Sequence, residues 1–270
     1  MLRRLLIRLG TCVLFSTAFA TAQTTAGLEP SALFDKGMNA LTGSSASRSG
    51  ANAIEYFRRS ADLGFAPAEV VLGYLYETGV NTTADPREAF ELYKKAAQQG
   101  DPLAQWLAGR MIYLGEVPPR DLNEAANWLD KSSSQNNPFA QYLLGKIAFE
   151  RSHYDRSEEL FREAAEQGLP RAQLQLALQL RDGQGVPRNV FEAYVWMLIS
   201  YNSGQHSISP ELQALEAELS STQIEQAKSK ARELEGSTDR SLMAHGCTGW
   251  RGEFDDVATP PPPDIQRFCR

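Results

Sequence analysis

The sequence lacks the short motifs that mark common catalytic and nucleotide-binding sites. Its 270 residues contain no G-x-S-x-G, S-x-x-K or H-E-x-x-H pattern, no Walker loop and no G-x-G-x-x-G. Paired acids such as Glu158-Glu159 are adjacent in sequence, and adjacent residues of a helix do not face each other. We therefore predict a protein that is not an enzyme and has neither catalytic residues nor a cofactor.

Histidine is scarce as well. The three His residues are His153, His206 and His245, and each lies in a predicted loop or in the C-terminal tail. His245-Gly246-Cys247 offers half of a zinc set, but zinc takes four ligands and no second pair is present. We predict no metal site, and we interpret His245 as an exposed residue beside a disulfide.

Long apolar runs and runs of like charge are also missing. No stretch approaches the roughly 20 apolar residues that span a bilayer, so we predict no transmembrane segment in the mature chain. The chain has 33 acidic and 27 basic residues, with a net charge of -6. Because phosphate neutralisation needs a clustered basic surface, this balance disfavours a nucleic-acid partner. Without a charge run, a membrane-surface patch is also disfavoured.

The N-terminus has the order of a secretory signal peptide. Arg3, Arg4 and Arg8 form a basic segment, an apolar segment runs to Ala20, and small residues follow it. We predict that residues 1–22 are the signal, with cleavage after Ala20 or Ala22, and that the protein is periplasmic or secreted. Processing leaves 24 basic and 33 acidic residues, a net charge of -9. Lipidation at Cys12 is the alternative, although Thr11, directly before the cysteine, is bulkier than such sites favour.

Two of the three cysteines remain after that cleavage. Cys247 and Cys269 both lie near the C-terminus of a chain that we expect to enter an oxidising compartment. A Cys247–Cys269 disulfide is the simplest interpretation, and two unrelated free thiols are the alternative.

Small residues recur along the chain at a fixed spacing. The first series is an alanine that recurs every 36 residues, except for one interval of 32. The second series lies five residues after each of these alanines and consists of glycines, with Ala177 as its last member. A third series of small residues has intervals of the same two lengths. The members are Ala32, Ala68, Ala104, Ala140 and Ala172; Gly37, Gly73, Gly109, Gly145 and Ala177; and Ala53, Ala89, Ala125, Ser157 and Ala193. Three series in phase through five units indicate an internal repeat.

Each unit contains two segments whose apolar and small residues have helical spacing. The fold class is therefore predicted to be all-α, an α/α solenoid of about five helix-pair repeats over residues 31–207. Asp85, Asp121 and Asn189 are expected to cap the second helices of their units, and Asp101 and Asn137 the first helices. Left-handed C-terminal positions are expected at Gly64, Gly100, Asn136, Gly168 and Gly204.

The last part of the chain departs from the repeat. Residues 208–235 are predicted to form two capping helices that close the solenoid, the second opening at a capping box, Thr222-x-x-Glu225, and ending near Glu235. Residues 236–270 show no helical period, and Pro260–Pro263 must be extended. We expect an irregular tail that the disulfide closes.

The repeat resembles the Sel-one-like repeat, a relative of the tetratricopeptide repeat. That family reads A-x-x-x-L-G-x-x-Y-x-x-G and then A-x-x-W-Y-x-K-A-A-x-x-G. Unit two matches the first half at Ala68, Leu72, Gly73, Tyr76 and Gly79, and the second half at Ala89, Tyr93, Lys95, Ala96, Ala97 and Gly100. The resemblance covers residues 31–235 and implies a solenoid whose first helices line a concave face.

On that implied face, positions two and six beyond the repeat Ala form a stripe of aromatic and basic residues, with Leu174 at the position of Tyr142 in the last unit. Rigid aromatics beside Arg or Lys are typical of a peptide-binding groove. The candidate partner-binding residues are Phe34, Tyr74, Trp106, Arg110, Tyr113, Tyr142 and Lys146. The alternative is packing between repeats, with Arg110 and Lys146 expected to be the least buried.

The function predicted from these features is a protein-binding scaffold. Resemblance to exported bacterial Sel-one-like proteins implies a role in envelope assembly, exopolysaccharide control or regulation of a membrane sensor. One alternative is a cell-wall glycan-binding protein in which Trp106 and Tyr142 stack against sugars. A second is a β-lactam hydrolase, but the relatives linked to that activity carry a Cys pair in each repeat, which is missing here.

Overall fold

The computed structural model describes residues 29–42 and 49–244. The predicted signal peptide, the Cys247–Cys269 pair and residues 245–270 of the predicted tail lie outside the described residues. Twelve α-helices and one short 3-10 helix make up the described part, which contains no strand. The predicted all-α class is confirmed.

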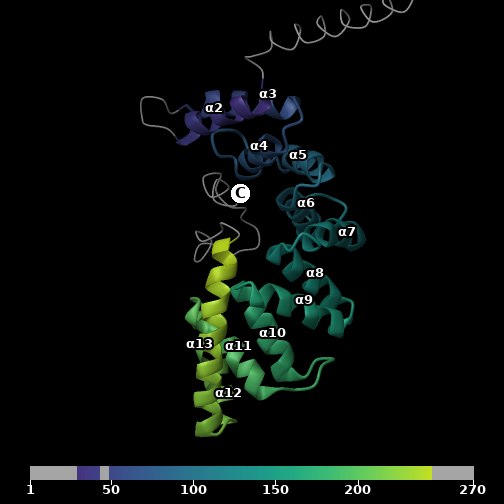
Figure 1. The fold of residues 1–270 in the computed structure, drawn as a ribbon. Helices are drawn as coiled ribbons and strands as arrows, with labels where there is room; N and C mark the ends of the chain where they lie inside the picture. The colour runs from purple at the N-terminus through teal and green to yellow at the C-terminus, as the bar shows by residue number, and fades with distance from the viewer. Residues whose placement is uncertain (1–28, 43–48, 245–270) are drawn as a thin grey trace, which may run out of the picture.

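Ten of the helices form five consecutive pairs. Each second helix also packs against the first helix of the next pair, so the pairs stack into a curved row with α4 and α6 toward its hollow side (Figure 1). The pairs are α2 (Pro30–Thr42) with α3 (Gly50–Asp62), α4 (Ala66–Thr78) with α5 (Pro86–Gln98), α6 (Pro102–Leu114) with α7 (Leu122–Ser133), α8 (Pro138–Glu150) with α9 (Tyr154–Glu166), and α10 (Pro170–Asp182) with α11 (Val190–Asn202). The predicted solenoid of five helix-pair units is confirmed.

The predicted caps set the ends of these helices. Asp85 accepts hydrogen bonds from the backbone N–H groups of Arg87 and Glu88, both at 3.1 Å. Asp101, Asp121, Asn137 and Asn189 cap their own helices in the same way. Asn136 has a φ of +64°, in the left-handed region where glycine occurs at the other junctions. Local side-chain chemistry therefore fixes where the chain turns.

The glycine series brings the two helices of a unit close together. A Cβ atom added to Gly109 would lie 2.7 Å from Leu129 Cγ and 3.1 Å from the Ala125 carbonyl oxygen. Gly37, Gly73 and Gly145 face Phe57, Tyr93 and Phe161 in the same way, at 2.6 to 2.8 Å. The atoms nearest to Gly109 therefore belong to its own partner helix, α7.

A row of buried polar side chains runs through the stacked units. This polar ladder consists of Glu69, Gln105, Gln141 and Gln173, each one residue after the repeat Ala. The first three accept hydrogen bonds of 2.6 to 2.9 Å from Gln99, Gln135 and Gln167, which follow directly or within two residues after the second helices of their units. Gln105 and Gln173 also donate to carbonyl groups of the preceding unit, at 3.2 Å each. The ladder thus ties helices both within and between units.

Two further helices cover the end of the row, as predicted. A 3-10 turn, η1 (His206–Ile208), leads into α12 (Ser209–Ala217), and the long α13 (Ser221–Ala244) then packs against α11 (Figure 1). Buried Leu215, Ala227 and Ala231 form the contact side of these helices. Within the described residues, no helix combines the length and the apolar character needed to cross a membrane.

Two predicted details of this cap are wrong. The capping box is formed by Ser220 and Gln223, because Ser220 N–H donates to Gln223 Oε1 at 3.0 Å and Gln223 N–H donates to Ser220 Oγ at 3.3 Å. The helix also runs nine residues past the predicted end at Glu235, to Ala244. No proline interrupts residues 236–244, and a single interior glycine at 236 only weakens a helix.

Candidate functional site

The structure does not present the predicted binding residues as one exposed stripe. Phe34 lies on α2, Tyr74 on α4, Trp106, Arg110 and Tyr113 on α6, and Tyr142 and Lys146 on α8. All are buried except Lys146, which is half-buried. The burial agrees with the alternative interpretation, in which aromatics at this spacing pack inside the solenoid.

Arg110 shows the largest departure from expectation, since it is fully buried at 0% exposure. Its guanidinium pairs with Glu77, and Glu116 lies 3.6 Å away. Tyr93 donates a 2.8 Å hydrogen bond to the same Glu77 carboxylate. Arg110 can be buried because carboxylates from α4 and from the loop after α6 balance its charge. The prediction that it is accessible is wrong.

Tyr113 and Lys146 belong to a second polar group, at the ends of α6 and α8. The Tyr113 hydroxyl donates to Glu150 Oε1 at 2.7 Å, and burial, with this carboxylate second, raises the pKa of Tyr113 well above its usual range. Lys146 Nζ lies 5.7 Å from the Tyr113 ring centroid and 6.0 Å from that of Tyr142. These contacts hold Lys146 along the helix surface.

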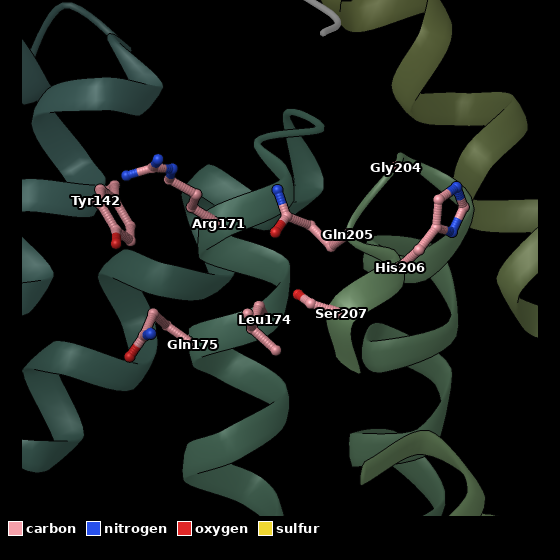
Figure 2. A pocket seen from close by; sticks show the side chains of 8 residues that line it. All are labelled: Tyr142, Arg171, Leu174, Gln175, Gly204, Gln205, His206 and Ser207. Carbon is pink, nitrogen blue, oxygen red and sulfur yellow. The ribbon is translucent and has the colours of Figure 1, made fainter. Parts of the chain in front are cut away.

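A pocket opens beside Tyr142, between α8, α10 and the segment that follows α11. It has a volume of about 540 Å³ and is shown in Figure 2. Its lining consists of Tyr142, Arg171, Leu174, Gln175 and the loop Gly204–Ser207. We call it the α8–α10 pocket. Tyr142 is the one predicted binding residue that it contains, and Leu174 comes from the same position of the next unit.

The other lining groups were missed by the sequence analysis. Arg171 directly precedes the repeat Ala172, outside the two positions that define the stripe, and Gln175 lies one residue beyond Leu174. The loop is marked in the sequence by a change of spacing. Pro follows the junction residue by two positions at Pro102, Pro138 and Pro170, and by six at Pro210. That change in spacing marks an irregular segment in the sequence. It does not indicate that this segment lines a pocket.

The pocket combines one buried ring with polar groups. Arg171, Leu174 and Gln175 are half-buried, whereas His206 and Ser207 are exposed. Burial raises the pKa of Tyr142, and the charge and hydrogen bond of Arg171 act in the opposite direction. In Figure 2 the Gln205 and Ser207 side chains point toward α10. The pocket thus presents a cation, amides, a hydroxyl and a leucine to one space.

This arrangement offers recognition groups rather than a reacting set. His206 and Ser207 are neighbours, but Figure 2 shows their side chains pointing in opposite directions, and the His206 ring packs edge-on against Tyr201 at 4.8 Å. Within residues 29–42 and 49–244, no three His, Cys, Asp or Glu side chains gather as metal ligands would. The lining can donate and accept hydrogen bonds and contact an apolar group.

Together, the stacked helix pairs and the pocket on their first helices define an α/α solenoid of short helical repeats. The sequence matches the Sel1 repeat family over five consecutive segments, residues 30–65, 66–101, 102–137, 138–169 and 170–205. The chain belongs to this family. Sel1 repeat proteins are generally protein-interaction scaffolds, and their fold is typically non-catalytic.

Solved structures share the fold at low sequence identity. A Sel1 repeat protein from Oxalobacter formigenes aligns with a TM-score of 0.62 and 21% identity, over 76% of this chain and 88% of that chain. A protective antigen of uropathogenic Escherichia coli with an SLR fold aligns with a TM-score of 0.50 and 22% identity, over 78% of this chain. This chain covers 55% of that antigen. No curated protein matches the sequence.

Proposed function

We propose that this chain is an exported scaffold that binds a protein partner through the α8–α10 pocket. The general role of Sel1 repeat proteins supports the protein-binding part. The observation that carries the proposal is the pocket itself, since its polar and apolar groups come from two successive units and the loop after the repeats. Concave sites with a few convergent polar groups are where ligands bind.

The pocket lies where a solenoid offers most surface to a partner. First helices line it, and the first helices α4 and α6 lie on the hollow side of the row in Figure 1. A curved row of repeats presents an extended concave surface that one segment of a partner can follow. A long surface alone would let the partner segment bind in several alignments. The polar groups of the pocket then select one alignment, because they contact one position of the segment.

Export rests on the order of residues at the N-terminus. A fusion of residues 1–30 to a reporter is expected to be exported and processed near Ala20 to Ala22. Envelope protein that still begins at Met1 would contradict it. In exported protein, nonreducing mass spectrometry should find Cys247 linked to Cys269, and free alkylation of both thiols would contradict the disulfide.

Site-specific photo-crosslinking in the native envelope tests the binding function. A photoreactive residue in place of Gln175 lies in the pocket, and one in place of Glu91 lies on the exposed side of α5. We expect a discrete adduct from position 175 and none from position 91. Adding Leu174→Trp, which fills the pocket without adding a charge, should remove that adduct. Identical adducts from both positions, or none from position 175, would show that the pocket does not bind a partner.

A further inference from the structure

The charge of Arg171 has no counter-ion within the described part of the chain. Other arginines of this part of the solenoid, such as Arg162 and Arg188, form ion pairs with carboxylates, whereas Arg171 forms no ion pair among residues 29–42 and 49–244. Its side chain hydrogen-bonds instead to the neutral Tyr142 hydroxyl. In a chain with more acids than bases, this half-buried guanidinium faces the pocket without a carboxylate.

The rest of the lining does not supply an anion either. Gln175, Gln205 and Ser207 are neutral, and Leu174 is apolar. In Figure 2 Arg171 and Gln205 both lie above Leu174 and Ser207, with the Arg171 guanidinium directed toward Tyr142 and the Gln205 side chain directed toward α10. A guanidinium in a site partly shielded from water is suited to bind a carboxylate by two parallel hydrogen bonds.

We infer that the ligand of the α8–α10 pocket is a peptide segment that presents a carboxylate to Arg171 and an apolar side chain to Leu174. This inference rests on the binding function proposed above and names the chemistry of the partner. The carboxylate comes from Asp, Glu or a C-terminus, and the neighbouring apolar residue covers the leucine. Arg171 is the residue that selects acidic segments over their neutral counterparts.

The rings of the site favour a peptide over a glycan. Sugars stack on the open face of an aromatic ring, but Tyr142 is buried and tilts against Phe161 with ring centroids 5.9 Å apart. Trp106, the other residue expected to stack a sugar, is also buried and packs against Phe139 at 5.2 Å. The accessible lining consists instead of groups that pair with peptide side chains and backbone.

Arg87 provides a matched control for Arg171. Both residues stand directly after the proline that begins their helix, Pro86 in α5 and Pro170 in α10, so their substitution removes the same charge from the same helical position. Arg87 is exposed on α5 and is not part of the pocket. An effect common to both variants therefore comes from helix stability or net charge, and an effect of Arg171→Gln alone comes from the pocket.

The experiment is a binding screen of the full chain on an array of octapeptides. Each peptide with one Asp or Glu beside apolar residues is paired with the same peptide carrying Asn or Gln. We expect acidic members to bind at least tenfold more tightly than their amide partners. Arg171→Gln should bring this ratio close to one, Arg171→Lys should keep part of it, and Arg87→Gln should leave it unchanged.

Each contrary result has a separate meaning. An acid preference that survives Arg171→Gln, or peptides that bind equally as acids and amides, would overturn this inference and leave the binding function standing. Tighter Arg171-dependent binding of a uronic-acid oligosaccharide would overturn the peptide assignment. A chain that retains no peptide of either kind would contradict both proposals. Melting curves of both variants exclude unfolding, and the acid-to-amide ratio does not depend on the amount of folded protein.

Discussion

At the scale of single residues, the repeat depends on glycines that leave no room for a methyl group. Gly109 faces Leu129 across the α6–α7 contact, and its counterparts face Phe57, Tyr93 and Phe161. The large residue on the second helix fills the space that the missing side chain leaves. Gly236 in α13 is the opposite case, since an added Cβ there meets nothing within 4 Å.

The same substitution at these two glycines should therefore have opposite effects. Gly109→Ala adds a methyl group against Leu129 and should lower the free energy of unfolding by about 1–3 kcal/mol. Gly236→Ala only improves helix propensity and should raise it by up to about 1 kcal/mol. Urea denaturation monitored by circular dichroism measures both. Equal effects of the two would show that α6 and α7 are not in close contact.

Arg110 forms a buried ion pair whose two members depend on each other. Its side chain is buried together with Glu77, whose side chain is 9% exposed. Burying a charge is unfavourable unless a partner compensates it, so removing one member of such a pair leaves the other in an apolar environment. The residue stabilises the junction of units two and three and does not line the pocket.

Arg110→Ala should consequently cost about 3–5 kcal/mol of stability. Arg110→Met combined with Glu77→Gln removes both charges and should recover most of that loss. Arg156→Ala, which breaks an exposed pair with Glu159, is the control and should change stability by about 0–1 kcal/mol. If Arg110→Ala behaves like Arg156→Ala in the same denaturation assay, the buried pair does not exist in solution.

At the scale of elements, the polar ladder joins one helix pair to the next. Three of its four members are glutamine, and Glu69 is the exception. Burial, which outweighs Lys95 and Gln99, raises the pKa of Glu69 above its usual range. The charged form of Glu69 is thus less stable in the folded chain than in the unfolded one.

Glu69→Gln should stabilise the protein at neutral pH. The new amide can accept from Gln99 as Gln105 accepts from Gln135, and can donate to the carbonyl of Ala61 as Gln105 does to that of Ala97. An acid whose pKa is raised in the folded state lowers the free energy of unfolding when it is ionised. This effect is complete above the folded pKa and absent below the unfolded pKa, where the acid is protonated in both states. The gain should therefore disappear as pH falls below about 4.3. A gain that is independent of pH, or a loss at pH 7, would contradict this account.

Element boundaries could be predicted from the sequence because they follow local rules. The N-caps, the left-handed positions and the phase of the small residues depend on neighbours within a few positions, and the structure confirms them. The start of α13 was misplaced by two residues because Ser220-x-x-Gln223 and Thr222-x-x-Glu225 both fit a capping box. Local rules cannot choose between these two overlapping patterns. The contact of α13 with α11, which also positions the helix, joins residues far apart in the sequence.

Burial and the pocket could not be predicted in the same way. Arg110 and Lys146 occupy equivalent repeat positions, but Arg110 meets Glu77 and Lys146 meets two tyrosine rings. The difference comes from the neighbouring unit, at residues roughly 30 positions away. The position of Arg171 in the pocket could not be predicted for the same reason, since the pocket is completed by a loop that follows the next helix, α11.

At the scale of the whole molecule, the pocket forms where the repeat geometry breaks. At earlier junctions a first helix begins two residues after the left-handed residue, as Pro102 follows Gly100. After Gly204, α12 begins only at Ser209, and the inserted turn supplies the pocket wall of Gln205 and Ser207. The repeats are regular through α10 and α11, and the proposed binding pocket lies where that regularity ends.

The central claim is that a partner segment binds in the α8–α10 pocket of the folded solenoid. The most direct measurement is methyl and amide NMR of the full chain, titrated with the tightest acidic octapeptide and then with its amide partner. The account predicts that the acidic peptide shifts the Leu174 methyl signals and the Gly204 to Ser207 amide signals, while those of α5 and α7 stay in place. Shifts centred on α5 and α7, with Leu174 unchanged, would contradict it.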